Sequence, residues 1–363
     1  MIFPQGNTIE SLSGYGNSGL INSTSNISGL NPAALNNIKN KSAGISYQFE
    51  SGINDVWIGV FKYKRITNFV PQSAGFILPY KNWRFGLSMS QHYNSFIFTP
   101  PIPVTTMEQP DGTGEFITAE YRTNLYDYSI ITSYVFENIF NNAELSVGTR
   151  IGWGNLIYNA SLADVQADIK DNSTTFSIGG VYKQKLEDKK YIQLGLYYES
   201  GTNFKSQYSY NGKGAFRSND SNYYQIQTSN LPFEAKFPSK MQFDFDVDII
   251  SNLKLLGNLS YIFWKDVKTN AANNIEFSFS GFYEFNDLFS ASAGFYNATL
   301  NFDYVPPILG SDINKEMKAL YLTAGFVINL KEFKIDAAFA DSHLISGAYR
   351  QQTIGKLGIG YNF

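Results

Sequence analysis

Apolar and polar residues alternate strictly along the last nine residues of the chain, GKLGIGYNF. A period of two predicts a β-strand with one apolar face. The same alternation recurs near residues 241–249, 253–263, 320–328 and 333–340. The apolar positions of the terminal strand are Leu357, Ile359, Tyr361 and Phe363.

This alternation, with the turn residues between segments, predicts about 14 strands, with boundaries uncertain by a few residues. Connections of two lengths alternate along the chain: short turns such as LEDKK and FNDL, and longer loops at 99–123, 161–172, 210–221 and 302–316. Outer-membrane barrels combine an even strand number with short periplasmic turns and long outer loops. The predicted strands are 43–64, 72–80, 83–98, 124–136, 143–160, 173–185, 189–209, 222–248, 252–267, 274–285, 288–301, 317–330, 332–345 and 351–363.

Two of these segments, 43–64 and 222–248, are too long for one crossing of a bilayer. The second contains Pro232 and Pro238. Proline removes a donor from the strand ladder, so these residues predict bends or a strand that extends beyond the membrane.

The composition favours a barrel with lipid outside and water inside. Charged residues make up 16% of the chain and aromatic residues another 16%, while mean hydropathy is −0.21. No apolar run is long enough for a membrane helix. The polar faces of the predicted strands contain Asp and Lys, which a dry core would not bury unpaired. The predicted fold is therefore an all-β, transmembrane, antiparallel β-barrel.

Charge and cysteine content exclude other classes of partner. The net charge of −3 argues against nucleic-acid binding. The chain has no cysteine, which rules out disulfides and thiolate zinc sites. We expect no cofactor. The start, MIFPQGN, has neither a basic region nor an apolar core of signal-peptide length, so we expect the mature form of an exported protein.

A short helix is predicted between a Ser- and Asn-rich leader and the first strand. In SGLNPAALNN, Asn31 is a suitable cap and Pro32 suits the first helical position. Residues 1–42 are rich in Ser, Thr and Asn and carry few charges: Glu10, Lys39 and Lys41. Such a segment gains little from burying apolar surface and would be disordered alone. Inside a polar lumen it could form hydrogen bonds to the wall, and barrels of this size are often plugged.

With these features together, nearly the whole chain resembles the FadL family of outer-membrane transporters for hydrophobic compounds, including its PorV-like branch. The resemblance rests on NPAAL at 31–35, the hairpin at 76–94, the hairpin at 237–267 and the terminal IGKLGIGYNF. It implies a fourteen-stranded barrel over 43–363 and a lumenal plug, or hatch, over 1–42. Asn31, Pro32 and Ala33 then form the plug turn.

The resemblance implies uptake of long-chain fatty acids or similar apolar compounds, with lateral release into the membrane through a kinked third strand. The matching stretch here, at Tyr93, Asn94 and Ser95, lacks a glycine. This departure leaves undecided whether the chain has the lateral exit. The PorV-like branch instead implies an adaptor subunit of a type IX protein secretion translocon. That branch favours an aromatic residue before Asn-Pro-Ala, and this chain has Leu30.

Loop 99–123 is the candidate entry groove for a ligand. The alternative is a surface loop that Pro100, Pro101 and Pro103 keep rigid. The groove residues are Ile102, Val104, Met107, Phe116 and Ile117.

The expected partners follow from the barrel. They are the lipid bilayer of a bacterial outer membrane, a hydrophobic ligand, detergent or lipid in the lumen, and the barrel-assembly machinery. A large secretion translocon is a further partner if the chain is an adaptor. The assembly signal is the terminal set Leu357, Ile359, Tyr361 and Phe363.

An enzyme is not expected. The two histidines, His92 and His343, lie in no catalytic motif, and no Ser–His set with an orienting third residue is recognisable.

Acidic and basic residues near the predicted periplasmic turns are assigned to no ligand. The acids could bind a divalent cation, but we favour a role in lining the wet periplasmic end, and no metal site is predicted. These residues are Asp244, Asp246, Asp248, Arg84, Lys183, Lys254 and Lys334.

Overall fold

The computed structural model describes most of the chain. The described residues are 20, 24–29, 31–51, 54–55, 62–64, 71–99, 101–104, 108–139, 142–162, 165–186, 190–213, 225–267, 272–301, 316–345 and 353–363.

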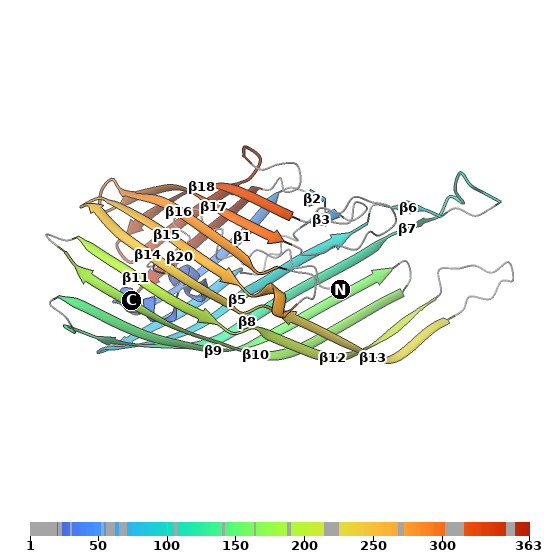
Figure 1. Ribbon diagram of the computed structural model, residues 1–363, viewed down its shortest axis with the longest axis horizontal. Coiled ribbons are helices and arrows are strands. Elements are labelled where there is room, and N and C mark those ends of the chain that lie inside the picture. The colour runs from blue at the N-terminus through green and yellow to red at the C-terminus, as the bar shows by residue number, and fades with distance from the viewer. Residues whose placement is uncertain are drawn as a thin grey trace.

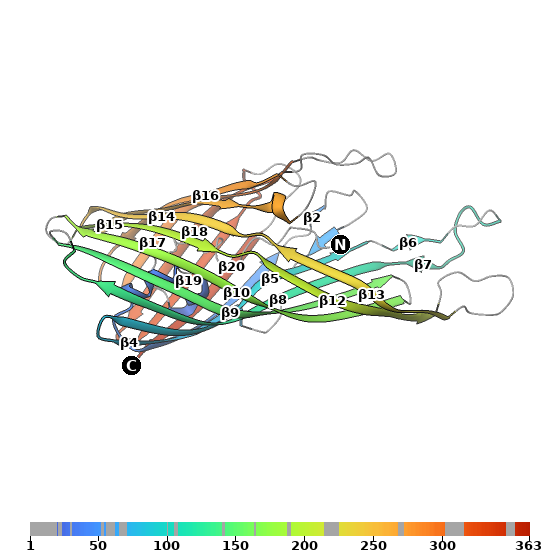
Figure 2. The same ribbon diagram turned by 60° about the horizontal axis from the view of Figure 1, so that its bottom comes forward.

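Fourteen antiparallel strands form a closed barrel, as the alternation predicts (Figures 1 and 2). Each strand pairs with the next around the ring, and β20 closes it by pairing with β1 from Ser42↔Asn362 to Ser51↔Thr353. The ring consists, in order, of β1 (Ser42–Ser51), β4 (Ser73–Tyr80), β5 (Trp83–Phe98), β8 (Ala119–Phe136), β9 (Ala143–Leu162), β10 (Val165–Lys185), β11 (Tyr191–Glu199), β14 (Lys240–Ile250), β15 (Leu253–Ile262), β16 (Asn274–Glu284), β17 (Phe289–Asn301), β18 (Glu316–Leu330), β19 (Phe333–Asp341) and β20 (Thr353–Asn362).

Side chains alternate between an apolar outer face and a polar inner face. On β9, Ile151 and Trp153 are 56% and 57% exposed, whereas Ser146 and Arg150 on the same strand are buried. The terminal strand follows the same rule, since Leu357, Ile359 and Phe363 are exposed and Tyr361 is half-buried. An exposed apolar surface of this extent suits contact with lipid rather than water.

The helices are short. η2 (Thr24–Gly29), η3 (Pro32–Asn37) and η4 (Trp264–Asp266) are 3₁₀ helices. Within the described ranges, no helix has the length and apolar character needed to cross a membrane.

One hairpin extends the wall beyond the apolar belt. β12 (Thr202–Lys213) continues the line of β11, and β13 (Gln225–Phe237) leads into β14 (Figure 2). Its outward side chains include three charged residues: Glu234 lies 3.3 Å from Lys236 and 3.8 Å from Lys205. This charged surface marks a part of the wall that suits water.

The predicted segments 189–209 and 222–248 are therefore each two strands rather than one. The first is interrupted at Ser200–Gly201 and the second at Pro238–Ser239. Pro238 lies at the interruption, where it removes no ladder bond, and Pro232 lies within β13 opposite Gln207.

Two other boundaries also differ from the prediction. Segment 43–64 is not one strand, because β1 ends at Ser51 and only the short strands β2 (Asn54–Asp55) and β3 (Lys62–Lys64) follow among its described residues. The predicted loop 161–172 is largely strand, since β9 and β10 remain paired up to Leu162↔Val165. Its outward residues are polar because this part of the wall lies beyond the apolar belt, and that polarity looks like a loop in the sequence.

An arginine at the centre of the outer face tests the lipid-facing assignment. We expect Ile151→Arg to destabilise the barrel in lipid vesicles by about 2–4 kcal/mol, since a charged side chain must then be buried in hydrocarbon. Urea titration in vesicles, followed by tryptophan fluorescence, measures the change. Asn203→Arg, on the exposed face of β12, is the control and should change stability little. Equal effects of the two substitutions would contradict the assignment.

Candidate lumenal site

A short N-terminal segment, residues 24–29 and 31–38, packs against the inner face of the barrel wall. η2 contacts β1, β4, β5 and β20, and η3 contacts β5, β8, β9 and β10. Asn31 caps η3, because its side-chain oxygen accepts a hydrogen bond from the Ala33 amide at 3.0 Å. Pro32 lies in the first turn, and Pro32 and Ala33 are buried.

Single polar contacts join this segment to strands around the ring. Ser25 donates to Asp336 of β19 at 2.8 Å, and Asn36 donates to Ser146 of β9 at 3.0 Å. The Asn31 amide donates to the carbonyl oxygens of Gly180 and Leu196 at 3.3 and 3.1 Å. Such contacts satisfy buried polar groups without requiring a large apolar interface.

Apolar side chains supply the rest of the contact. Ile27, Leu35 and Ile38 of the segment form one buried cluster with Ile77 of β4 and Ile131 of β8. The segment is therefore held both by hydrogen bonds and by burial of aliphatic surface.

Glycines on the inner face leave the space that the segment occupies. A Cβ atom at Gly44 would lie 2.5 Å from the backbone nitrogen of Ser25. A Cβ at Gly148 would overlap the Pro32 carbonyl group, and one at Gly179 would overlap the side-chain oxygen of Asn31. No larger residue fits at these positions unless the segment moves.

A β-bulge at His92 reverses which residues of β5 face the lumen. Before the bulge in the chain, Ser88 and Ser90 are buried on the inner face, and Leu87 is 56% exposed on the outer face. The register with β8 shifts between Gln91 and Tyr93. Because one extra residue exchanges the two faces of a strand, Tyr93 turns inward.

The interruptions at Ser200–Gly201 and Pro238–Ser239 have the same effect on the facing strands. Tyr197 of β11 is buried inside, and after the interruption Phe204 of β12 takes the inward position. Gln242 of β14 is buried inside, and Phe237 of β13, before the interruption, also faces inward.

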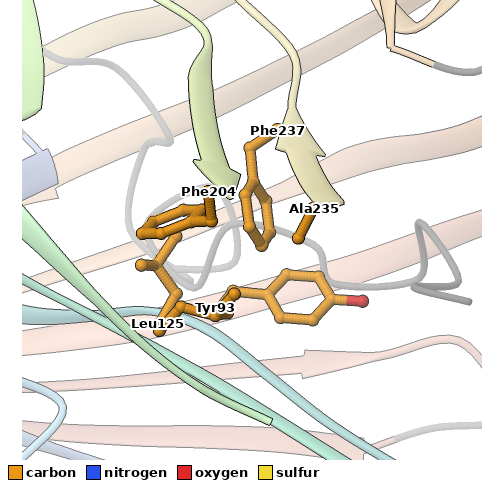
Figure 3. Close-up of a cluster of buried hydrophobic side chains, with 6 residues drawn as sticks. Tyr93, Leu125, Phe204, Ala235 and Phe237 are labelled. Atoms are coloured by element: carbon orange, nitrogen blue, oxygen red, sulfur yellow. The ribbon is translucent and has the colours of Figure 1, made fainter. Parts of the chain in front are cut away.

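These inverted residues, together with residues on the regular inner faces of β8 and β9, form an apolar group, here called the lumenal cluster (Figure 3). The ring centroids of Tyr93 and Phe237 are 5.3 Å apart, and the rings meet edge to face. The ring centroids of Phe204 and Phe237 are 5.9 Å apart. Phe233 packs against the group. A neutral apolar molecule could replace these ring contacts without losing hydration. The cluster consists of Tyr93, Leu125, Leu156, Phe204, Ala235 and Phe237.

The predicted entry groove lies elsewhere. Ile102 of β6 (Ile102–Pro103) pairs with Ile117 of β7 (Phe116–Ile117), and this hairpin projects beyond the neighbouring strands (Figures 1 and 2). Ile102 and Phe116 are 45% and 63% exposed, and Val104 is half-buried. Met107 lies outside the described residues. None of these residues belongs to the lumenal cluster.

The predicted kink residues follow the bulge directly. Tyr93 and Asn94 are buried, and the backbone of Ser95 pairs with Thr123 of β8. β4 begins only at Ser73, which pairs with Ser90.

The basic residues and acids of the short-turn end have local partners. Arg84 donates to the Ile38 carbonyl oxygen at 3.1 Å, and Lys254 lies 3.1 Å from Glu284. Lys183, Lys254, Lys334 and Asp246 line a cavity of about 450 Å³ at that end. Asp248 accepts from the Tyr191 amide, and Gln242 donates to Asp244. Among the described residues, no group of three or more His, Asp or Glu side chains is arranged to hold a metal.

Sequence reasoning did not identify Leu125, Leu156, Phe204 and Phe237 as site residues. The inward orientation of Phe204 and Phe237 depends on the two interruptions, whereas Leu125 and Leu156 lie on the regular inner faces of β8 and β9. Pro238 and Gly201 were the available signals, because both residues favour breaks in a strand.

Thiol cross-linking tests the inversion at His92, because the chain has no cysteine of its own. The double variant Tyr93→Cys, Phe237→Cys should be joined by a short bis-thiol reagent. Deletion of His92 should leave this cross-link in place, since Gln91 and Tyr93 would then lie opposite Tyr126 and Leu125 in a regular ladder. The double variant Asn94→Cys, Phe237→Cys should not be joined with or without His92, because residue 94 faces the opposite side from residue 93. A cross-link between positions 94 and 237 would refute the inversion.

The control for this experiment is the double variant Ser88→Cys, Ser129→Cys. The native hydroxyl oxygens of this pair are 2.7 Å apart, below the bulge. The control pair should cross-link with or without His92.

Comparison with known proteins shows similarity in three-dimensional structure. No protein-family model and no curated protein matches the sequence. A crystal structure of a Pseudomonas aeruginosa FadL homologue is 14% identical, with a TM-score of 0.60 over 100% of this chain and 99% of that one. The Pseudomonas putida toluene transporter TodX is 13% identical, with a TM-score of 0.59 over 99% and 98%. The Ralstonia pickettii toluene transporter TbuX is 11% identical, with a TM-score of 0.58 over 92% of each chain. The chain therefore has the fold of the FadL-like barrels.

Proposed function

We propose that this protein is an outer-membrane channel of the FadL kind that takes up hydrophobic small molecules. The observation that carries the proposal is the lumenal cluster, in which Tyr93, Phe204 and Phe237 are turned into the barrel by three separate irregularities of the wall. An ion or a sugar that entered this group would lose hydration that rings and aliphatic side chains replace only in part. An apolar ligand gains about 25 cal/mol for each Å² of its surface removed from water.

In this proposal residues 1–42 are a plug and residues 43–363 the transmembrane barrel. The described contacts of the N-terminal segment support it, since the segment fills space between opposite parts of the wall. Asn31, Pro32 and Ala33 fix its turn against β9, β10 and β11. Most of the polar contacts are single hydrogen bonds, each worth about 1 kcal/mol, and the burial of Ile27, Leu35 and Ile38 adds to them.

We infer lateral release into the membrane as the route of exit. The bulge in β5 supports this route, because it breaks the register of the wall between Gln91 and Tyr93, at the start of the proposed kink. A molecule that leaves the lumenal cluster at this level would pass into lipid without entering water. Loop 99–123, with Ile102, Val104, Met107, Phe116 and Ile117, is the proposed entry.

The ligand class is apolar and small or slender. The structurally similar TodX and TbuX are described as toluene transporters, and another similar structure is a FadL homologue. Both an aromatic hydrocarbon and the tail of a long-chain fatty acid are compatible with a cluster of rings and aliphatic side chains.

A wall substitution that expels the N-terminal segment tests the plug. Gly179→Val should raise the leakage of small sugars into vesicles severalfold, because its side chain overlaps Asn31. Gly180→Val is the matched control, since a Cβ there makes only an ordinary contact of 3.8 Å with the Ser146 carbonyl oxygen. Liposome swelling measures leakage. Deletion of residues 1–42 should also raise it, and unchanged leakage after that deletion would refute the plug.

Uptake of toluene and of a radiolabelled fatty acid by cells that express the protein tests transport. Phe204→Asp should lower the initial rate about tenfold, since a buried charge disfavours an apolar ligand by more than about 1.4 kcal/mol. Leu344→Asp, at a position 79% exposed, is the control and should transport normally. No uptake of either compound by the unaltered protein would overturn the proposal.

Affinity purification from the native membrane distinguishes the transporter from an adaptor. A transporter should be recovered with lipid or another apolar compound and without a stoichiometric large subunit. Recovery with one very large barrel subunit and an empty lumen would favour the adaptor of a type IX secretion translocon.

A further inference from the structure

A polar pocket lies between the lumenal cluster and the N-terminal segment. It is lined by Leu125, which belongs to the cluster, and by Ser28, which belongs to the segment. Its volume is about 20 Å³, enough for one water molecule or one ligand hydroxyl group. Its polar lining includes His92, Asp127, Arg150, Thr175, Ser177 and Glu199.

Asp127 accepts a hydrogen bond from Thr175 across Gly152 of the intervening strand. The Thr175 hydroxyl of β10 donates to Asp127 of β8 at 2.6 Å, over Gly152 of the strand between them. A Cβ at Gly152 would lie 2.6 Å from the Thr175 hydroxyl and 2.8 Å from the carboxylate. This contact satisfies one carboxylate oxygen and leaves acceptor capacity on the other, since an ionised carboxylate accepts about four hydrogen bonds.

Glu199 has partners on several sides. His92 Nε2 lies 3.4 Å from it, and the Tyr197 hydroxyl donates to it. Lys240 is its partner in the β11–β14 ladder. Arg150 donates to the Ile27 carbonyl oxygen at 3.3 Å. With His92 neutral, the two carboxylates are balanced by Arg150 and Lys240.

Ser177 supplies a hydroxyl that has no partner among the described residues. Its side chain is 1% exposed, and its oxygen makes no hydrogen bond to any of them. Leaving a buried hydroxyl unsatisfied costs about 1–3 kcal/mol, so a group that binds it gains that amount.

We propose that this pocket recognises a hydroxyl group on an otherwise apolar ligand, so that neutral alcohols and phenols are preferred to hydrocarbons and to carboxylic acids. The inference rests on the proposed function and names the ligand class of the same site. The apolar body of the ligand occupies the lumenal cluster. Its hydroxyl group donates to Asp127 or Glu199 and accepts from Ser177.

A carboxylate ligand fits this pocket poorly. It would bring a further negative charge beside Asp127 and Glu199, while Arg150 and Lys240 already balance those two. A buried charge without a counter-charge is strongly disfavoured. A plain hydrocarbon suffers no repulsion but leaves Ser177 unsatisfied.

Three probes with one ring and one methyl group test the proposal: 4-methylphenol, toluene and 4-methylbenzoate. Binding to the full-length protein in detergent, at a mildly alkaline pH at which the phenol stays neutral, is measured by equilibrium dialysis. We expect 4-methylphenol to bind about three- to tenfold more tightly than toluene, the effect of one added hydrogen bond. The benzoate should bind more weakly than either compound.

Two serine variants assign the preference to the pocket. Ser177→Ala should lower the ratio of phenol to toluene affinity, because the ligand oxygen loses its donor while toluene no longer leaves a buried hydroxyl unsatisfied. Ser133→Ala is the matched control, because Ser133 is also buried with no partner among the described residues but lies outside the pocket, and it should keep the ratio. Toluene binding reports that each variant is folded.

The outcomes separate this inference from the proposed function. Equal binding of the phenol and toluene, or tightest binding of the benzoate, would overturn the inference while leaving hydrophobic uptake in place. Retention of the preference in Ser177→Ala would also overturn it. Absence of binding by all three probes would overturn both.

Discussion

The ladder between β20 and β1 fixes the inward and outward directions of the whole barrel. It joins Ser42 to Asn362 and Ser51 to Thr353, so the first and last strands of the ring become neighbours. A closed ring leaves no open edge, which is what allows strands to satisfy their amides and carbonyls within hydrocarbon. Because side chains alternate with a period of two, a shift of one residue at this seam would exchange apolar and polar faces throughout the strands that follow.

The interior depends on the same alternation. The N-terminal segment fits only because Gly44, Gly148 and Gly179 fall on inward positions. Its polar contacts also use inward residues, such as Ser146 and Asp336. The outer belt and the contents of the lumen are thus two results of one register.

The sequence was sufficient for the number of strands and for most of their boundaries. Segments 72–80 and 83–98 were predicted within one residue, because the two turn residues Lys81 and Asn82 mark the boundary between them. Prediction failed where alternation no longer reports the membrane. Residues 161–172 were read as a loop, although β9 and β10 are paired there with polar residues on the outside.

The site was harder to predict than the fold for a related reason. Phe204 and Phe237 face inward only because each follows or precedes a short interruption, and Tyr93 only because of one extra residue at His92. A periodic pattern cannot reveal where its own phase changes. The geometry of Asp127, Thr175 and Gly152 is likewise invisible in sequence, because it arises across three strands.

The bulge at His92 has a consequence for how such a barrel can diversify. Loss of that residue would leave Gln91 and Tyr93 opposite Tyr126 and Leu125 in an unbroken ladder, so both parts of the strand would keep their inner and outer faces. A residue could therefore be gained or lost beside the lumenal cluster without a change in the lipid-facing belt. A lineage could in this way alter the lumen in a single mutational step without first passing through a barrel that fails to insert.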